Sequence, residues 1–203
     1  MDNGVMTPAC KTLAMSKASL DRPGPWTEAE YLALDRASDR IELIDGRLQV
    51  SPGPTWEHQE ISFRLHTAIQ EAASATKLRV AEGVNVRLAT DRLVIPDLVV
   101  ADLDRRRVGL VTDAAEVILV AESTSPSNAD TDRTRKMRLY EVARIPWYLL
   151  VEPDMTDYES IRLRLFQLQG SEYTPHAIAE HGEILTANVP FPLAIATTDL
   201  IRP

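Results

Sequence analysis

The spacing of hydrophobic residues changes along the chain, and each spacing predicts a different kind of element. Between 61 and 72, apolar residues recur at offsets of 4, 7, 8 and 11, at Ile61, Leu65, Ala68, Ile69 and Ala72. These offsets place them on one face of a helix, which we expect to cover a sheet. Short runs rich in Val, Ile and Leu follow at 93–101, 117–121 and 147–151. Their length and composition predict central strands that are buried on both faces.

Shorter signals predict the elements that precede these strands. Thr27 and Glu30 have the spacing of a capping box, in which the hydroxyl and the carboxylate satisfy free N–H groups at a helix start. Asp45 and Gly46 join two short alternating segments, 41–44 and 47–50. This dipeptide is favoured in tight turns, so we expect a β-hairpin here.

The second half of the chain predicts a crossover followed by an antiparallel extension. A helix is expected from about 130 to 143, between two of the apolar runs, so that the strands on either side of it pair in parallel. Beyond Asp154, polar and apolar residues alternate at 161–165, and a turn at Gly170 precedes a further short strand at 173–178. The whole pattern predicts an α/β fold with a mixed β-sheet core flanked by helices.

The length and the local composition predict one folded domain with an arm. Residues 1–25 mix small, polar and Pro/Gly residues without periodicity, which indicates a flexible N-terminal arm. The remaining residues, 26–203, are enough for one domain with a continuous core. A lone cysteine, Cys10, and the lack of a long apolar stretch favour a soluble cytoplasmic protein with no membrane segment.

Charge limits how the protein can hold nucleic acid. The formal net charge is −8, which argues against binding through a broad basic surface. Any attraction for DNA must be local. Two clusters could supply it, although most such clusters are solvated faces; they are Arg105–Arg107 and the group Arg133, Arg135, Lys136 and Arg138.

Two carboxylates stand where an apolar sequence makes them costly. Asp97 lies inside the run 93–101, directly after Pro96, and Glu122 ends the run 117–121. An unpaired carboxylate in a dry core costs several kcal/mol, so each needs a cation, a donor or an opening. Proline is tolerated in strands mainly at edges or bulges, so the strand is expected to be distorted where Asp97 projects. Lys136 lies on the following helix and could reach back to Glu122.

Such carboxylates on neighbouring strands can hold Mg²⁺ or Mn²⁺, which prefer oxygen ligands, and a nearby lysine would stabilise charge on a phosphate. Each residue also has a structural interpretation. Asp97 could accept a hydrogen bond at a strand bulge, Glu122 could cap a loop, and Lys136 could form a surface ion pair with Asp132. The residues alone leave both interpretations open.

The joint order of these segments resembles the Uma-type restriction endonucleases, a branch of the PD-(D/E)xK nuclease superfamily. The similarity runs from about 26 to 154 and rests on 41–48, His58, 96–100, 122–127, the spaced residues Asp132, Lys136 and Tyr140, and 145–148. The resemblance implies a restriction-endonuclease-like fold. It also implies that Asp97 and Glu122 bind the metal, that Glu42 assists them and that Lys136 acts in catalysis.

The sequence departs from the superfamily pattern at Thr124, where a lysine is expected two residues after the acid. In this branch the lysine lies on the next helix, at the position of Lys136. His58 could contact phosphate or adjust a carboxylate, but a lone histidine is more often structural. Tyr140 could hydrogen-bond Glu122, although an aromatic at helical spacing is more often packed in the core, so it is left out of the catalytic set.

The function expected from the sequence is a divalent-metal-dependent endonuclease. Hydrolysis of a DNA phosphodiester by metal-activated water would use Asp97 and Glu122 as ligands, Glu42 as an assistant and Lys136 to stabilise the transition state. Cutting both strands would favour a homodimer. Three alternatives stay open: a silent nuclease-fold binding or regulatory module, a metal hydrolase of a small phosphorylated or carboxylated molecule, and a structural protein that binds no metal.

Overall fold

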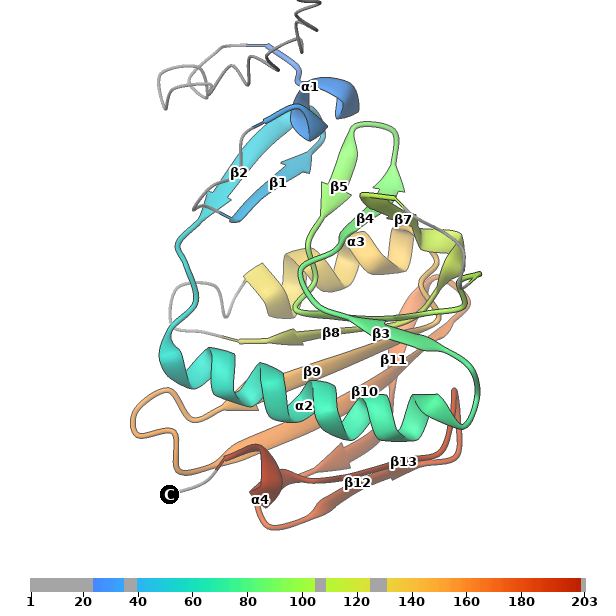
Figure 1. Ribbon diagram of the computed structural model, residues 1–203. Coiled ribbons are helices and arrows are strands. Elements are labelled where there is room, and N and C mark those ends of the chain that lie inside the picture. The colour runs from blue at the N-terminus through green and yellow to red at the C-terminus, as the bar shows by residue number, and fades with distance from the viewer. Residues whose placement is uncertain (1–23, 35–39, 105–108, 125–130, 202–203) are drawn as a thin grey trace, which may run out of the picture.

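The computed structural model describes residues 24–34, 40–104, 109–124 and 131–201. The strands form two larger sheets and a two-stranded ribbon, and Figure 1 shows the smaller of the two larger sheets above the larger one. The predicted arm, 1–25, lies almost wholly outside the described residues, as do Cys10 and Arg105–Arg107. Among the described residues no helix is long and apolar enough to cross a membrane.

The five-stranded sheet contains the predicted hairpin. Its strand order is β2-β1-β5-β4-β7, with bounds β1 Arg40–Ile44, β2 Arg47–Ser51, β4 Asn85–Ala89, β5 Arg92–Val94 and β7 Val111–Asp113. Asp45 and Gly46 both adopt positive φ angles, +52° and +73°, between the paired strands β1 and β2, so the hairpin is confirmed. Helix α1, Glu28–Leu32, begins with the predicted capping box of Thr27 and Glu30.

The six-stranded sheet is the centre of the molecule. Its order is β11-β10-β9-β8-β6-β3, with bounds β3 Arg79–Ala81, β6 Leu98–Ala101, β8 Val117–Ser123, β9 Trp147–Pro153, β10 Ile161–Gln169 and β11 Glu172–Ala179. Strands β8 and β9 are parallel, and β10 and β11 form an antiparallel hairpin, as predicted. The predicted class, a mixed α/β fold with an antiparallel extension, is therefore confirmed.

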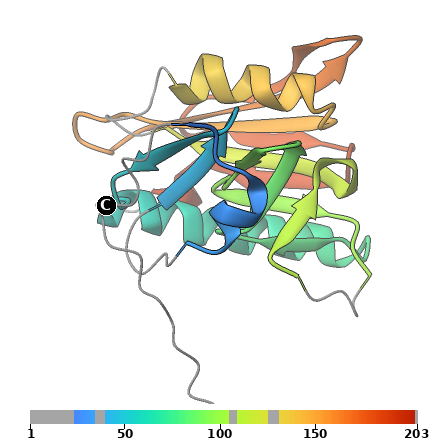
Figure 2. The ribbon, with the colours of Figure 1, turned by 90° about the horizontal axis from the view of Figure 1, so that it is seen from above.

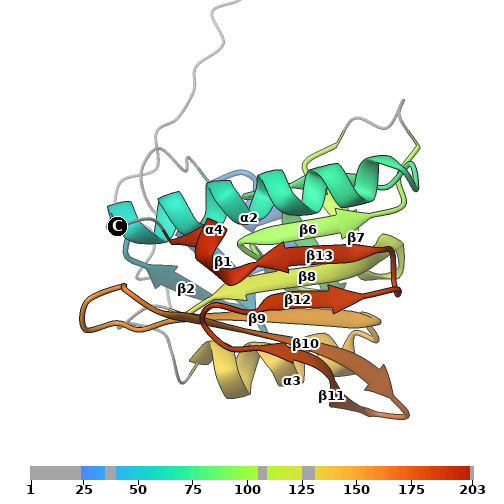
Figure 3. The ribbon, with the colours of Figure 1, turned by 90° about the horizontal axis from the view of Figure 1, so that it is seen from below.

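Successive residues of these strands enter cores on opposite faces of the six-stranded sheet. On one face, Leu119 and Ala121 of β8 pack with Ile61, Leu65 and Ile69 of the long helix α2, Trp56–Ser74. On the other, Val120 packs with Tyr140 of α3, Met137–Val142, and with residues of the five-stranded sheet. Figures 2 and 3, seen from above and below, place α2 and α3 on opposite sides of the sheet. The alternation follows from the two-residue period of a strand.

Three smaller elements complete the structure. A π-helical segment, Thr131–Lys136, leads directly into α3, and a 3-10 turn, Ala114–Glu116, precedes β8. After β11 the chain forms the ribbon of β12, Ile184–Ala187, and β13, Leu193–Ala196, and then α4, Thr197–Leu200. The sequence interpretation ended at the strand near 178 and did not predict this final ribbon and helix.

The apolar run 93–101 is not one strand, which corrects the sequence interpretation. It contributes β5 to the five-stranded sheet and β6 to the six-stranded sheet, and the residues Ile95, Pro96 and Asp97 connect them. Pro96 has no N–H to give to a ladder, which is consistent with a break in pairing here. The hairpin strands accordingly lie in a different sheet from Glu122 and not in one shared layer.

Candidate active site

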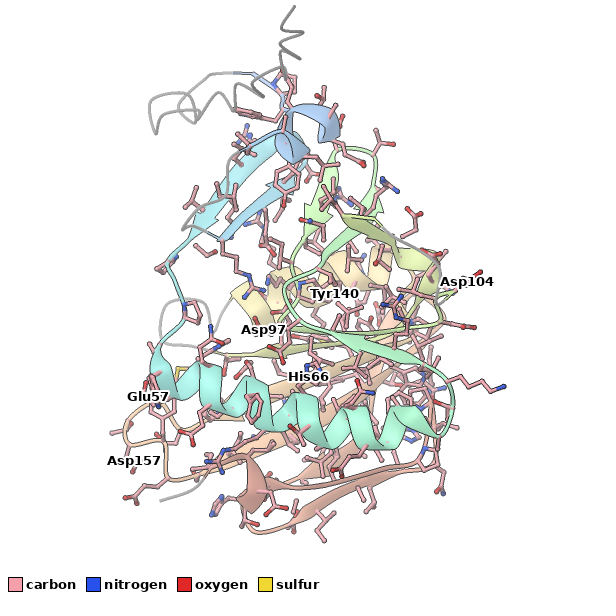
Figure 4. The ribbon with its side chains drawn as sticks, viewed as in Figure 1. Glu57, His66, Asp97, Asp104, Tyr140 and Asp157 are labelled. Carbon is pink, nitrogen blue, oxygen red and sulfur yellow. The ribbon has the colours of Figure 1, made fainter. Side chains whose placement is uncertain are left out.

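Asp97 lies at the connection where the chain passes from one sheet to the other (Figure 4). Strand β1 holds this connection through two side chains on one of its faces. Glu42 Oε1 accepts a hydrogen bond of 2.8 Å from the Ile95 N–H, and Arg40 donates to the Ile95 carbonyl oxygen. Residues i and i+2 of a strand share a face, so β1 directs Arg40 and Glu42 toward the same segment.

Three donors from three elements surround the Asp97 carboxylate. Arg40 Nη1 from β1 donates to Oδ1 at 2.5 Å. The ring Nε2 of His58, on the first turn of α2, lies 3.2 Å from Oδ2, and the Ser123 N–H of β8 donates to the same oxygen at 2.8 Å. Asp97 is only 8% exposed, so these contacts replace the water that a carboxylate otherwise requires.

Glu122 lies in the penultimate position of β8 and is buried. Its Oε1 accepts hydrogen bonds from Lys136 Nζ, at 3.0 Å, and from the Tyr140 hydroxyl. Its Oε2 is buried and has no hydrogen-bond partner among the described residues. A carboxylate oxygen in that position lacks the partner that buried polar atoms normally have.

Lys136 joins the two sheets through their carboxylates. Its Nζ lies 3.0 Å from Glu122 Oε1, in the six-stranded sheet, and 3.4 Å from Glu42 Oε1, in the five-stranded sheet. The lysine is 5% exposed, so it is not part of a surface ion pair. The last residue of the π-helical segment thus delivers the ammonium group that Thr124 cannot supply.

The pKa values of the two central carboxyl groups shift in opposite directions. Burial opposes ionisation of Asp97, but the hydrogen bond from His58 and the charge of Arg40 hold its pKa well below its usual range. Burial raises the pKa of Glu122, despite the opposing charge of Lys136. Asp97 is therefore a stable anion, whereas the site disfavours the charge on Glu122.

Two neighbours of these carboxylates also have shifted pKa values. Burial opposes the charged form of His58, yet the hydrogen bond to Asp97 and its negative charge raise the pKa of His58. Burial and the charge of Glu122 raise the pKa of Tyr140 far above its usual value. Tyr140 therefore keeps its proton and acts as a donor to Glu122.

The structure brings the four predicted site residues together from four separate elements. Asp97 comes from the connection, Glu122 from β8, Glu42 from β1 and Lys136 from the π-helical segment. The pairing of Leu98 with Ala121 places Asp97 beside Glu122. The side chain of Asp132 and the residues 125–130 lie outside the described part of the chain.

Arg40 is a site residue that the sequence pattern does not single out. For His58, the pattern leaves a structural role and a site role open. One signal could have found Arg40, because it directly precedes the predicted strand 41–44, and extending that strand by one residue places Arg40 on the face of Glu42. Other basic residues are engaged elsewhere. Arg135 donates to Gln49, and the exposed Arg138 pairs with Glu141.

The donor set fits a hard divalent cation held by few protein ligands. No group of three or more His, Cys, Asp or Glu side chains with metal-binding geometry occurs among the described residues. Mg²⁺, however, is commonly bound by one or two carboxylates together with water and substrate phosphate. Asp97 and Glu122 offer such a pair, and Glu122 Oε2 is a buried acceptor that still lacks a partner among the described residues.

A cleft of about 370 Å³ opens beside Asp97. Its lining includes Arg40, His58, Gln59, Ser62, Pro96 and Asp97. We call it the Asp97 cleft. Its volume is in the range of small-molecule sites in proteins, and two of its lining residues, Arg40 and His58, contact the carboxylate.

The fold and this site define a restriction-endonuclease-like α/β protein. Among solved structures, the chain is similar to one described as a "putative nuclease belonging to DUF820" from Anabaena variabilis, with 19% sequence identity and a TM-score of 0.66. The match covers 87% of this chain and 97% of that one. At this identity the likeness establishes the fold alone.

The family is established by the sequence itself. Residues 28–198 match the model of the family Uma2, described as "Putative restriction endonuclease". The chain therefore belongs to the Uma2 family, as its motifs predicted. A search of curated proteins found no match.

Proposed function

We propose that the protein is a divalent-metal-dependent nuclease that hydrolyses DNA phosphodiester bonds. The observation that carries the proposal is the convergence of Asp97, Glu122 and Lys136, all buried, from three elements. Membership of a family described as restriction endonucleases supports the reaction class. DNA as the substrate, a homodimer and a cytoplasmic location stay predictions from the sequence.

In this proposal Asp97 and Glu122 would hold the cation. A bound Mg²⁺ or Mn²⁺ would orient the attacking water and offset negative charge that develops on the phosphate. Tyr140 and Lys136 hold Glu122 Oε1, which directs Oε2 as the remaining acceptor. The Ser123 N–H and His58 fix Asp97 in the same way.

Lys136 would act on the phosphate from the side of Glu122. Its ammonium group already touches Glu122 and Glu42, so its position is set before substrate binds. A preorganised cation of this kind stabilises charge that forms in the transition state. Glu42 holds the lysine and the Ile95 N–H and so assists as a positioning residue.

The test is cleavage of supercoiled plasmid and of single-stranded DNA with Mg²⁺, Mn²⁺ or EDTA. Asp97→Asn, Glu122→Gln and Lys136→Met are compared with the native chain. We expect metal-dependent cutting by the native chain and its loss in all three variants. No cutting by the native chain on either substrate would sink the proposal.

A silent binding module is the second candidate, and one contact favours it. Arg40 gives Asp97 a counter-ion within the protein, so this carboxylate does not need a metal for its charge to be balanced. A module of this kind would bind DNA with the same affinity in EDTA and in Mg²⁺. The nuclease would bind DNA in a cation-dependent way.

A further inference from the structure

Two residues that line the Asp97 cleft carry buried polar atoms without a hydrogen-bond partner among the described residues. Two of its lining residues, His58 and Ser62, are each less than a tenth exposed. The His58 Nδ1 and the Ser62 Oγ are buried and have no hydrogen-bond partner among the described residues. Buried polar atoms are normally bonded, so both residues have hydrogen-bonding capacity that a small shift of either side chain would present to the cleft.

Arg40 stands where a cation on Asp97 would have to bind. Oδ2 of Asp97 already accepts from His58 and from the Ser123 N–H, which leaves Oδ1 as the more open oxygen. Arg40 Nη1 lies 2.5 Å from Oδ1. A divalent cation on that oxygen would be in close contact with the guanidinium, and the two positive charges would repel.

Arg40 also has a route away from Asp97. Its side chain is 23% exposed, compared with 6% for Asp97, and it lines the Asp97 cleft. The planar guanidinium matches the geometry of a phosphate and can bind it with two parallel hydrogen bonds. Glu82 also lines the cleft, and its negative charge would oppose a bound phosphate. Its Oε1, however, lies 2.7 Å from His66 Nδ1 and is hydrogen-bonded there.

We propose that the Asp97 cleft is a phosphate subsite for nucleic acid, and that Arg40 exchanges between Asp97 and the phosphate bound there. This inference rests on the proposed function. A phosphate in the cleft draws Arg40 away and frees Oδ1 for the divalent cation. Nucleic acid and cation therefore bind cooperatively, and by linkage each raises the affinity for the other by the same factor.

The experiment measures binding and not cleavage. Calorimetric titration gives the Mn²⁺ affinity of the native chain and of Arg40→Gln, with and without a short phosphorothioate-linked DNA that resists cutting, in single- and double-stranded form. In the native chain we expect the DNA to raise the Mn²⁺ affinity by about 5-fold or more, the lower end of typical coupling between sites. In Arg40→Gln we expect tighter Mn²⁺ binding without DNA, weaker DNA binding and coupling close to 1-fold.

Two further variants separate the exchange from a change in charge or stability. Arg92→Gln removes the same charge from an arginine whose side chain is equally shielded, 22% exposed, and whose partner is the exposed Asp45. It is expected to match the native chain in both affinities. Ser62 lines the cleft, and its hydroxyl makes no hydrogen bond to Asp97. Ser62→Ala is therefore expected to weaken DNA binding and leave Mn²⁺ binding without DNA unchanged.

The outcomes separate this inference from the proposed nuclease function. Equal Mn²⁺ affinity in Arg40→Gln and the native chain, with unchanged coupling, would make Arg40 a structural brace and overturn the exchange while cleavage stands. Cooperative binding without any cleavage would overturn the nuclease and keep the exchange. No Mn²⁺ binding by any folded variant, with folding checked by thermal unfolding, would overturn both.

Discussion

Asp97 and Glu122 are neighbouring buried carboxylates, yet their surroundings act on them in opposite directions. Asp97 accepts from Arg40, His58 and a backbone N–H, and its pKa is lowered. Glu122 has donors at one oxygen only, and burial raises its pKa. The donors around a buried carboxylate, and not its depth, therefore decide whether it is a stable anion.

The difference also assigns separate tasks to the two residues. The charge of Asp97 is stabilised by Arg40, so a cation bound there would share that carboxylate with the guanidinium. Glu122 has a charge that the site disfavours and an oxygen without a protein donor among the described residues, so a cation would improve its surroundings. In the proposed two-carboxylate site, Asp97 would attract the cation electrostatically, and Glu122 would gain most from its arrival.

The largest expected effect is from Lys136→Met, which removes the ammonium between Glu122 and Glu42. Breaking a buried ion pair from one side costs about 3–5 kcal/mol, and we expect a loss of this size in urea unfolding. Loss of a preorganised cation should also lower the cleavage rate by about 100-fold or more.

The matched control is Arg138→Met, because Arg138 is an exposed cation on α3, the helix that directly follows Lys136, and pairs with Glu141. Because the arginine is exposed, solvent screens the pair and it contributes at most about 1 kcal/mol, so stability and cleavage should change little. The double variant Lys136→Met/Glu122→Gln should regain part of the stability but no cleavage. If Lys136→Met were as stable as Arg138→Met, the lysine would not be the counter-ion of the site.

The next largest effects are expected from the isosteric changes Asp97→Asn and Glu122→Gln, which compare the two carboxylates directly. An asparagine at 97 can keep its carbonyl oxygen where it accepts from His58 and Ser123, but its NH2 group then faces the Arg40 guanidinium, and each unsatisfied buried donor costs about 1–3 kcal/mol. A glutamine at 122 still accepts from Lys136 and Tyr140 at its carbonyl oxygen. We therefore expect Asp97→Asn to destabilise by about 2–4 kcal/mol and Glu122→Gln by less than about 1 kcal/mol.

Denaturant unfolding at neutral pH measures both variants, and cleavage assays should find both inactive. Equal losses of stability would show that the two carboxylates are not distinguished by their donors. A larger loss of stability in Glu122→Gln would mean that the fold depends more on the charge of Glu122 than on that of Asp97.

A smaller effect is expected from Tyr140→Phe, which removes a donor from Glu122 Oε1. A hydrogen bond to a charged group is worth about 1.5–3 kcal/mol, and Lys136 remains on the same oxygen, so we expect a loss near 1.5 kcal/mol. Tyr173→Phe is the control, because its buried hydroxyl donates to the Ile145 carbonyl, outside the site. Both should destabilise, and only Tyr140→Phe should slow cleavage.

The parts of the fold that depend on short stretches of sequence were predictable. The Asp45-Gly46 turn, the apolar face of α2 and the parallel pair β8 and β9 each follow from signals within one or two elements. The break of 93–101 into two strands was only partly visible. Pro96 indicated a distortion, but not that the chain would pass into another sheet.

The sequence indicates the residues of the candidate site that stand in motifs, but not those that only tertiary packing brings there. Asp97 and Glu122 stand out because a carboxylate interrupts or ends an apolar run. Arg40 lies 57 residues from Asp97 along the chain, and their contact depends on how the two sheets meet. The spacing of a strand can place Arg40 on the face of Glu42, but no local pattern specifies how the sheets meet, so the contact between Arg40 and Asp97 could be seen only in the structure.

The smallest expected effect comes from a partly exposed carboxylate, Glu28, which pairs with the partly exposed Arg87. The hydrogen bond from Arg87 lowers the pKa of Glu28. A lowered pKa in the folded state means that the stabilisation is present above the unfolded pKa and is lost as the pH falls through the folded one. Glu28→Gln should therefore cost less than about 1 kcal/mol at pH 7, and the difference from the native chain should fade in acid. Urea unfolding from pH 7 to pH 3 measures it, and salt should weaken it. A difference as large as that of Asp97→Asn would mean that solvent exposure does not separate surface pairs from the buried site.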